Sequence, residues 1–495
     1  MLKKTIYILL ATFALLLFVV LIKTYLFSNK VTNTEGKPIV MVMDTAAAAH
    51  LQEAVGIPTI SYDNKIDSSA ASFDTFFDFI SLKYPLVFKT LELEKIGRHS
   101  LLLHWKGEKS GIVKPVLLYA HLDVVPVDGL KVDTLHHGFS ADRWYFDPFS
   151  KKIIEDSIRG RGTIDDKLGV IGILEATNKL IADNFEPQHD IYLAFGEDEE
   201  AGGKNGAALI AQKLLEQGIH FEWMLDEGGM VAENMVPFVK APVALVMTAE
   251  KGYMTIDLSV SGPGGHSSFP PKESPIDILA AAITRLKDNP FESTICSPVA
   301  AFMDHIGPEM KFPFNILFLN RWLFSPIILN EYGKIAEGNA MIRTTMAFTE
   351  IHGGIKENVM PANVSATVNF RLLPGITSTE VVKYVKEIIN DKRVVLHVRD
   401  DIQEPSTVSA TSSSGFQSIA KTIHVVFPDA VVAPSLSIAA TDSRHFNKVA
   451  DNRYRFLPVR MNRDILSGMH GINEKIATRN FMESIQFYET LLRSN

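Results

Sequence analysis

Three apolar runs of strand length, each followed closely by an imidazole or a carboxylate, constrain the fold of this chain most. PVLLYA precedes His121, DIYLAF precedes the acids Glu199 and Glu200, and FEWML precedes Asp226. Continuous apolar runs fit strands that are buried on both faces, and helical patterns between them predict a mostly parallel α/β sheet. Because open α/β sheets bind ligands beyond the carboxyl ends of their strands, these side chains are expected to lie close together.

The chain is expected to contain at least two folded domains, because 495 residues exceed what one core usually supports. Near residue 250 the pattern changes to strands of alternating polarity, at 253–260 and 364–372, with a helix that starts at Pro275 between them. This mixture predicts an α+β insert over 250–403. The α/β domain is therefore expected in two pieces, 31–249 and 404–495, that flank the insert.

An uninterrupted apolar run from Ile6 to Ile22 follows Lys3 and Lys4. Its length is about the minimum for a membrane span. Bulky residues at 25–27 argue against a cleavage site of the A-x-A type, so residues 1–30 are interpreted as an uncleaved membrane anchor, with a cleaved secretion signal as the alternative. The two lysines ahead of the run favour a short cytoplasmic tail and a body in a periplasm, a lumen or the extracellular space.

Charge and cysteine content exclude several classes of protein. The formal net charge of -8 comes without a long Lys/Arg-rich run, so nucleic acid is not an expected partner. Cys296 is the only cysteine, which excludes intramolecular disulfides and cysteine-clustered zinc sites. The sequence also lacks a GxSxG elbow and a GxxxxGK[ST] loop, which disfavours serine hydrolases and nucleotide-binding proteins.

Imidazoles and carboxylates at the strand ends, together with two further motifs, form a ligand set that suits zinc. The further motifs are GRGTIDDK, with Asp165 and Asp166 at the start of a predicted helix, and GMHGINEK, with His470. Spacing alone does not decide which of the two adjacent aspartates binds metal. Since a carboxylate between two ions can bridge a two-metal centre that activates water, the sequence is interpreted as a two-metal hydrolase.

Two short spacings suggest roles for individual side chains. Asp123 lies two positions after His121, so on a strand end both side chains can point the same way and the carboxylate can orient the imidazole. The adjacent side chains of Glu199 and Glu200 diverge. One of them can bind metal while the other takes a proton from water and passes it to a leaving amine.

The motifs HLDVVPV, GRGTIDDK, DEEAGG, LDEGG, SGPGGHSS, KENVMPA, RLLPG, ATDSRHF and HGINEK, in this order, resemble the aminoacylase and carboxypeptidase S group of co-catalytic zinc metallopeptidases. The resemblance covers nearly the whole chain after the apolar segment. The stretch from Asn339 to Ala362 most resembles carboxypeptidase S and the N-fatty-acyl-amino acid synthase/hydrolases. The resemblance implies two zinc ions per subunit and an insert that serves as a lid or dimerisation domain.

The resemblance also implies a role for each site residue. The zinc ligands would be His121 and Asp226 for one ion, Glu200 and His470 for the other, and Asp165 as the bridge. Related enzymes differ in which acid at the fourth motif is the ligand, so Glu227 stays an alternative to Asp226. Glu199 would act as general base and then as general acid, and Asp123 would orient His121.

Three further residues are implied to contact the substrate. His266, in the turn GPGGHSS, matches a histidine that in related dimers reaches the neighbouring subunit's site and stabilises the oxyanion, which implies a homodimer. Arg444 matches a residue that grips the substrate's carboxylate, a role that suits a planar guanidinium, and Asn358 matches a residue near the oxyanion. The implied reaction is hydrolysis of the amide bond of N-acyl amino acids, fatty-acyl ones included, or of small peptides.

Two questions stay open on the sequence alone. The segment from Lys311 to Leu329 is rich in Phe, Leu and Ile, and is interpreted as core or subunit packing, with a surface for an acyl chain or a membrane as the alternative. A noncatalytic, metal-containing binding or scaffold protein that retains the fold is the alternative to the enzyme. Loss of turnover on metal removal would distinguish the enzyme from it.

Overall fold

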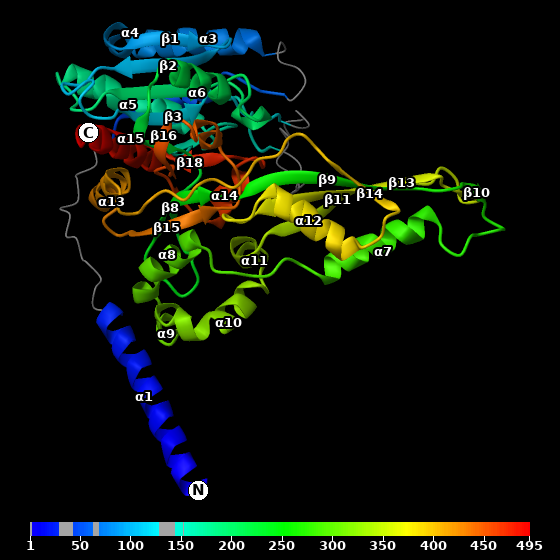
Figure 1. Cartoon of the computed structure of the whole chain (residues 1–495). Helices are drawn as coiled ribbons and strands as arrows, with labels where there is room; N and C mark the ends of the chain where they lie inside the picture. Colours follow the sequence, from blue (N-terminus) through cyan, green and yellow to red (C-terminus); the bar gives the residue numbers. More distant parts are fainter. Residues whose placement is uncertain (1, 29–42, 63–68, 128–143, 152) are drawn as a thin grey trace.

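A large mixed sheet dominates the molecule, and a smaller antiparallel sheet extends from one end of it (Figure 1). The computed structural model describes residues 2–28, 43–62, 69–127, 144–151 and 153–495. A long helix, α1 (Leu2–Ser28), projects from the underside of the globular part (Figure 1). The predicted fold class is confirmed: a mixed α/β protein with one N-terminal helix apolar and long enough to cross a membrane.

The 10-stranded sheet has the order β1-β2-β5-β3-β6-β16-β8-β7-β17, with β15 beside β8. Its strands are β1 (Glu92–Ile96), β2 (Ser100–Trp105), β3 (Val116–His121), β5 (Ile191–Gly196), β6 (Phe221–Asp226), β7 (Val231–Ala232), β8 (Val243–Glu250), β15 (Val431–Ser437), β16 (Ala450–Arg455) and β17 (Arg460–Met461). The four central strands β5, β3, β6 and β16 are mutually parallel, as predicted, whereas β1 and β2 add an antiparallel edge.

Helices cover both faces of this sheet, which explains the continuous apolar runs. On β3, Leu118 and Ala120 belong to the core beneath one layer of helices, and Leu117 and Tyr119 to the core beneath the other. The first layer contains α2 (Thr45–Val55), α3 (Ala70–Lys83), α4 (Pro85–Thr90), α5 (Lys167–Ala182), α13 (Ser414–Val426) and α15 (Thr478–Arg493); the second contains α6 (Ala207–Glu216). Every residue of β3 is therefore buried.

The smaller sheet is antiparallel, with the order β11-β13-β9-β14. It comprises β9 (Gly252–Ser261), β11 (Thr345–Gly353), β13 (Asn363–Leu372) and β14 (Val394–Val398), with α7 (Pro275–Asp288) and α12 (Ser378–Ile389) packed on it. Alternate residues of β9, such as Met254 and Ile256, point into a separate core that both helices share. Two short strands far apart in sequence, β10 (Gly265–His266) and β12 (Val359–Met360), pair antiparallel, and β10 lies at the tip (Figure 1).

One helical segment of the predicted 250–403 insert packs elsewhere. It contains α8 (Ser297–Ile306), η2 (Gly307–Glu309), α9 (Phe314–Leu319), α10 (Arg321–Tyr332) and α11 (Ala336–Ile342). Val299 and Met303 of α8 share a core with Val243 of β8 and Ala433 of β15, so this segment covers the large sheet. Periodicity predicts that a helix has an apolar face but leaves open which sheet that face covers.

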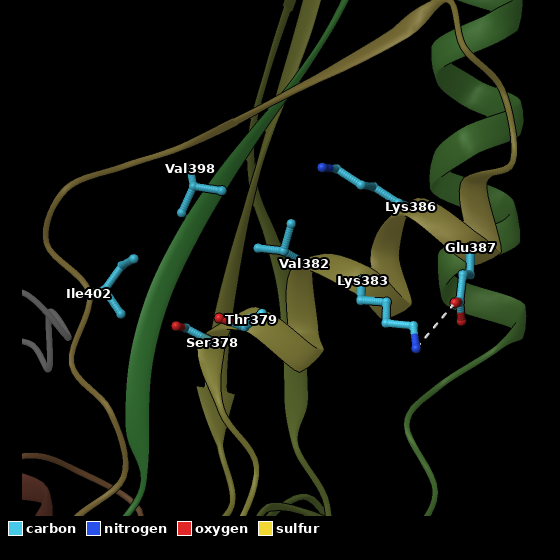
Figure 2. Close-up of a pocket in the computed structure, with 8 residues that line it drawn as sticks. All are labelled: Ser378, Thr379, Val382, Lys383, Lys386, Glu387, Val398 and Ile402. Carbon is cyan, nitrogen blue, oxygen red and sulfur yellow. Dashed lines mark ion pairs between the residues drawn. The ribbon is translucent and has the colours of Figure 1, made fainter.

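A surface pocket lies on the insert between α12 and β14 (Figure 2). Val382, Val398 and Ile402 form its apolar wall, and Lys383 lies 3.9 Å from Glu387 beside it. The pocket contains none of the predicted site residues. It is therefore separate from the strand ends where those residues gather.

Candidate active site

Asp165 stands between the two predicted histidine ligands. His121 ends β3, Asp165 lies between β4 (Ser157–Arg159) and α5, and His470 follows α14 (Arg463–Gly468). The Nε2 atom of His121 is 2.9 Å from Asp165 Oδ1, and the Nε2 atom of His470 is 2.9 Å from Asp165 Oδ2. Each oxygen of one buried carboxylate thus faces a different imidazole.

Glutamates complete a group on either side of Asp165. Glu200, in the short helix η1 (Glu199–Ala201), has its Oε1 atom 3.1 Å from His470 Nε2. Among the described residues, ligand atoms within 4.8 Å of one another form three overlapping groups: His121 with Asp165 and Glu227, Asp165 with Glu200 and His470, and His121 with Glu199 and Glu200. Ligand atoms around a tetrahedral zinc ion lie roughly 3.4 Å apart, so this donor set fits two metal ions that share Asp165.

The structure brings Glu227 to this cluster in place of the predicted Asp226. Asp226 ends β6, and its carboxylate accepts hydrogen bonds from the backbone N–H groups of Ser443 at 2.8 Å and Glu227 at 2.9 Å. The Oε1 atom of Glu227 lies 4.0 Å from His121 Nε2. Because successive side chains at a strand end point in opposite directions, only one of these two acids can face the imidazole.

Asp123 positions more than its predicted partner. Its Oδ1 atom lies 3.2 Å from His121 Nδ1, and its carboxylate also accepts hydrogen bonds from the backbone N–H groups of Glu199 and Glu200, both at 3.1 Å. Ser61 donates a further hydrogen bond at 2.5 Å. One fully buried carboxylate therefore sets the orientation of both the imidazole and the glutamate pair.

The acids of the cluster repel one another in a buried setting, which favours a bound cation. Burial and neighbouring carboxylates raise the pKa of Glu199 and of Glu227 well above the ordinary value. Burial also acts to raise the pKa of Asp165, but hydrogen bonds with His121 and His470 lower it overall. Hydrogen bonds with Asp165 and Glu200 raise the pKa of His470 to about 10. The histidine and acidic side chains are thus positioned to bind metal.

The acidic run EDEE divides into two pairs with different partners. Glu197 accepts a hydrogen bond from the backbone N–H of His99 at 2.6 Å, and burial raises its pKa to about 7. Asp198 accepts hydrogen bonds from the N–H groups of Asn205 at 2.8 Å and Gly206 at 2.7 Å. The first pair, Glu197 and Asp198, therefore holds neighbouring loops, and the second pair, Glu199 and Glu200, belongs to the cluster.

Glu474 is a site residue that no motif of the sequence predicted. It is fully buried and accepts hydrogen bonds from the N–H groups of Gly162 at 3.1 Å and Ile164 at 2.6 Å, and from Arg161 at 2.9 Å. These contacts fix the loop that presents Asp165. Its position in the motif GINEK, four residues after His470, was the one sequence feature that could have pointed to it.

Arg444 lies beside the end of the short helix η1, which carries the glutamate pair. It belongs to η3 (Asp442–Phe446), its side chain is 17% exposed, and a Cβ atom added to Gly202, at the end of η1, would be 4.0 Å from its guanidinium. A buried ion pair, also missed from the sequence, holds η3: Arg455 donates to Glu250 at 2.8 Å, and Glu250 accepts from the Thr441 backbone at 2.8 Å. This network fixes the backbone from which the Arg444 side chain extends.

Replacing Arg455 with Met is expected to destabilise the fold by about 3 kcal/mol, because Glu250 would stay buried without its cation. Denaturant unfolding measures the change. The double variant Glu250→Gln/Arg455→Met should recover most of the loss. Arg399→Met, which removes a half-exposed partner of Asp257, should cost much less, because water screens that pair. Equal costs for Arg455→Met and Arg399→Met would contradict the assignment.

His266 and Asn358 lie together, but at the tip of the insert. β10 and β12 pair His266 with Val359, and the Ser267 N–H donates to the Asn358 carbonyl at 3.2 Å. His266 is exposed, and its Nδ1 atom accepts from the Ser268 N–H at 3.1 Å. Within the described part of the chain, no hydrogen bond or ion pair joins either residue to the cluster.

Comparisons with known proteins identify the family of the chain. The family model described as peptidase family M20/M25/M40 matches residues 117–494. The chain is 38% identical to a probable carboxypeptidase S-like 2 of Dictyostelium discoideum, over 91% of this chain and 85% of that one. It is 37% identical to the N-fatty-acyl-amino acid synthase/hydrolase PM20D1 of Xenopus tropicalis, over 90% and 85%.

Solved structures share the fold. An M20 family metallo-carboxypeptidase from Sulfolobus solfataricus aligns with a TM-score of 0.66 at 19% identity, covering 91% of this chain and 99% of that one. A dinuclear metal-binding M20 peptidase from Bacillus subtilis aligns with a TM-score of 0.54 at 12% identity, covering 91% and 99%. By the family match over residues 117–494 and the identity to these relatives, the chain belongs to peptidase family M20/M25/M40 and is a hydrolytic enzyme of the metallopeptidase and amidohydrolase type.

Proposed function

We propose that this protein uses two zinc ions to hydrolyse the amide bond of N-acyl amino acids or small peptides and releases an amino acid with a free carboxylate. The observation that carries the proposal is the position of Asp165, whose two oxygens each lie 2.9 Å from a different imidazole. Such a carboxylate can serve two ions at once.

The chain offers a complete ligand set for this centre. In the proposal, His121 and Glu227 hold one ion, Glu200 and His470 hold the other, and Asp165 bridges them. When bound, the ions would supply Lewis acidity that lowers the pKa of a water molecule and polarises a carbonyl group. The ligand Glu227 replaces the expected Asp226, whose carboxylate is engaged by the Ser443 backbone.

Glu199 is proposed to transfer the proton. Its backbone is fixed by Asp123, and its carboxylate belongs to the group formed with His121 and Glu200. As a general base it accepts a proton from the attacking water, and as a general acid it then donates that proton to the leaving amine. Burial, which raises the pKa of Glu199, suits a group that must hold the proton between these two steps.

Arg444 is proposed to bind the carboxylate of the released amino acid, because its guanidinium lies beside the η1 turn that carries Glu199. This contact limits the reaction to substrates with a terminal carboxylate. The similar proteins include one named for carboxypeptidase S and one for N-fatty-acyl-amino acids, and both substrate classes meet that requirement. We therefore retain peptides and N-acyl amino acids as the candidate substrates.

His266 and Asn358 are proposed to act on the site of a partner subunit in a homodimer. Both residues are exposed on the tip of the insert, away from the cluster of their own chain. Mixing the inactive variants Glu199→Gln and His266→Ala tests this arrangement. Heterodimers that regain part of the activity would support it, and a monomer with full activity would contradict it.

We also propose that α1 is retained as a membrane anchor, with Lys3 and Lys4 in the cytoplasm and the catalytic portion outside. The apolar length of α1 supports this, and a cleaved secretion signal is the alternative. The mass of the mature chain distinguishes the two, because cleavage would remove the helix.

Removal of metal is expected to abolish turnover. A chelator should stop the release of free amino acid, and added zinc should restore it with about two ions per chain, as expected for a two-metal centre. The measurement compares a long-chain N-acyl phenylalanine with a dipeptide. Preference for the acyl substrate would support the lipid class, and preference for the dipeptide a carboxypeptidase. Turnover that persists after complete loss of metal would contradict the proposed function.

A further inference from the structure

We propose that η2, α9, α10 and the loop at Phe238 form a membrane-contact surface that rests on the bilayer in which α1 is anchored. This inference builds on the proposed anchor. The surface is distinct from the acid and imidazole cluster and from the insert pocket. Its partner is the lipid interface on the side of the membrane that faces the catalytic portion.

The length of α1 sets the height of this surface above the bilayer. The apolar run from Ile6 to Ile22 is about 26 Å long at 1.5 Å per residue, slightly less than the ~30 Å hydrocarbon core. The whole run is therefore needed to cross. Val20 then lies at the outer edge of the core, and Thr24 lies one turn further toward the headgroups.

The same turn of α1 docks on α9. Val20 is 5% exposed and Thr24 is 9% exposed, although most of α1 is open. Asn320, fully buried at the end of α9, donates from its side-chain nitrogen to Thr24 Oγ1 at 2.9 Å and to the Val20 carbonyl at 3.4 Å. A polar contact at this level holds α9 beside the edge of the hydrocarbon core.

Large apolar side chains are exposed around this docking point. Phe312 is 75% exposed, Trp322 53%, Ile327 49% and Phe238 47%. Phe238 stacks on Phe314 of α9, so its loop belongs to the same surface. Aromatic rings at the boundary between lipid and water are favoured because one part of the ring is apolar and the other tolerates water.

The charges nearby fit a lipid interface. Lys311 is exposed next to Phe312, where a lysine can reach the headgroups. Arg321 of α10 is paired in a bidentate manner with Asp304 of α8. Figure 1 places α9 beside the upper end of α1 and α10 next to α9, at the underside of the catalytic portion. The anchor and the surface together fix the enzyme in a defined orientation on the membrane.

The tryptophans of this chain provide the probe. Trp322 is the exposed one of four; Trp105, Trp144 and Trp223 are 6%, 4% and 1% exposed. The full chain is reconstituted into phosphatidylcholine vesicles with and without lipids brominated near the headgroup, which quench nearby indoles. The difference between the emission of the unaltered chain and that of Trp322→Phe is the emission of Trp322. We expect brominated lipid to quench this emission strongly, and its maximum in vesicles to lie at a shorter wavelength than in detergent-free buffer.

A matched control places an exposed tryptophan far from the bilayer. Leu82 in α3 is 79% exposed, and Figure 1 shows α3 at the opposite end of the molecule from α9. The double variant Trp322→Phe/Leu82→Trp should show little quenching by brominated lipid. Equal quenching of Trp322 and of the tryptophan introduced by Leu82→Trp would overturn the proposal, since it would mean that the surface makes no specific contact.

Two measurements on the same vesicles separate the possible failures. The mass of the reconstituted chain reports whether α1 is retained, and its loss would overturn both the anchor and the surface. Dipeptide hydrolysis by Trp322→Phe should equal that of the unaltered protein, because Trp322 lies outside the cluster. Unquenched Trp322 in a chain that retains α1 and hydrolyses the dipeptide would overturn the membrane surface alone and leave the proposed function standing.

Discussion

Glu199→Gln is expected to lower kcat by about 100- to 10,000-fold while the metal content stays unchanged. Glutamine keeps the shape of the side chain and leaves the backbone contact with Asp123 in place, but it cannot accept a proton from water. The measurement pairs kcat for amino acid release with metal analysis of the purified variant. A parallel loss of metal would show instead that Glu199 acts as a ligand.

Glu197→Gln is the matched control for this prediction. It changes the same residue type two positions earlier in the acidic run, where the carboxylate accepts backbone hydrogen bonds from the β1–β2 turn. Its kcat is expected to stay within a few-fold of the unaltered enzyme, because an amide oxygen can still accept one of those bonds. If both variants lose turnover equally, the separation of the run into two functional pairs is wrong.

Glu227→Gln is expected to lose one of the two metal ions, whereas Asp226→Asn should keep both. The Glu227 carboxylate lies in one group with His121 and Asp165, where its charge would balance that of a bound cation. The affinity at this position should fall by more than the roughly 10- to 100-fold that follows loss of an outer partner of a ligand. Metal titration monitored by calorimetry measures the change, and turnover should fall with it.

Asp226→Asn tests the neighbouring position with the same chemical change. Its side-chain oxygen would still accept the Ser443 N–H that anchors η3, so the fold should be maintained. Loss of an ion in Asp226→Asn, together with retention of both in Glu227→Gln, would restore the ligand first expected from the sequence. Loss of an ion in both variants would indicate that both acids are needed to hold the end of β6 in the conformation that binds metal.

Local sequence patterns predicted elements of both the large sheet's domain and the insert. The helix expected after Asp165 is α5, the helix expected at Pro275 is α7, and the alternating strand expected at 253–260 is β9. These features depend on the spacing of apolar residues along one segment, which is visible without knowledge of any partner. The strand ends that place His121 and the glutamate pair at one edge of the sheet follow from the same periodicity.

Side-chain direction and long-range partners required the tertiary structure. Asp226 ends β6 and Glu227 follows it. Which of the two acids faces His121 depends on where the pairing of β6 ends and on the Ser443 N–H, 217 positions from Asp226. Glu474 holds the loop of Asp165 across 309 positions, and no spacing within one motif encodes that contact.

Local patterns and residue identity were thus sufficient to predict the family, the fold class and the types of side chain that gather at the site. Three features required the folded chain: Glu227 faces His121, Glu250 and Arg455 form a buried pair behind η3, and α8 covers the large sheet. These three depend on which surfaces meet, and burial makes each choice costly to reverse.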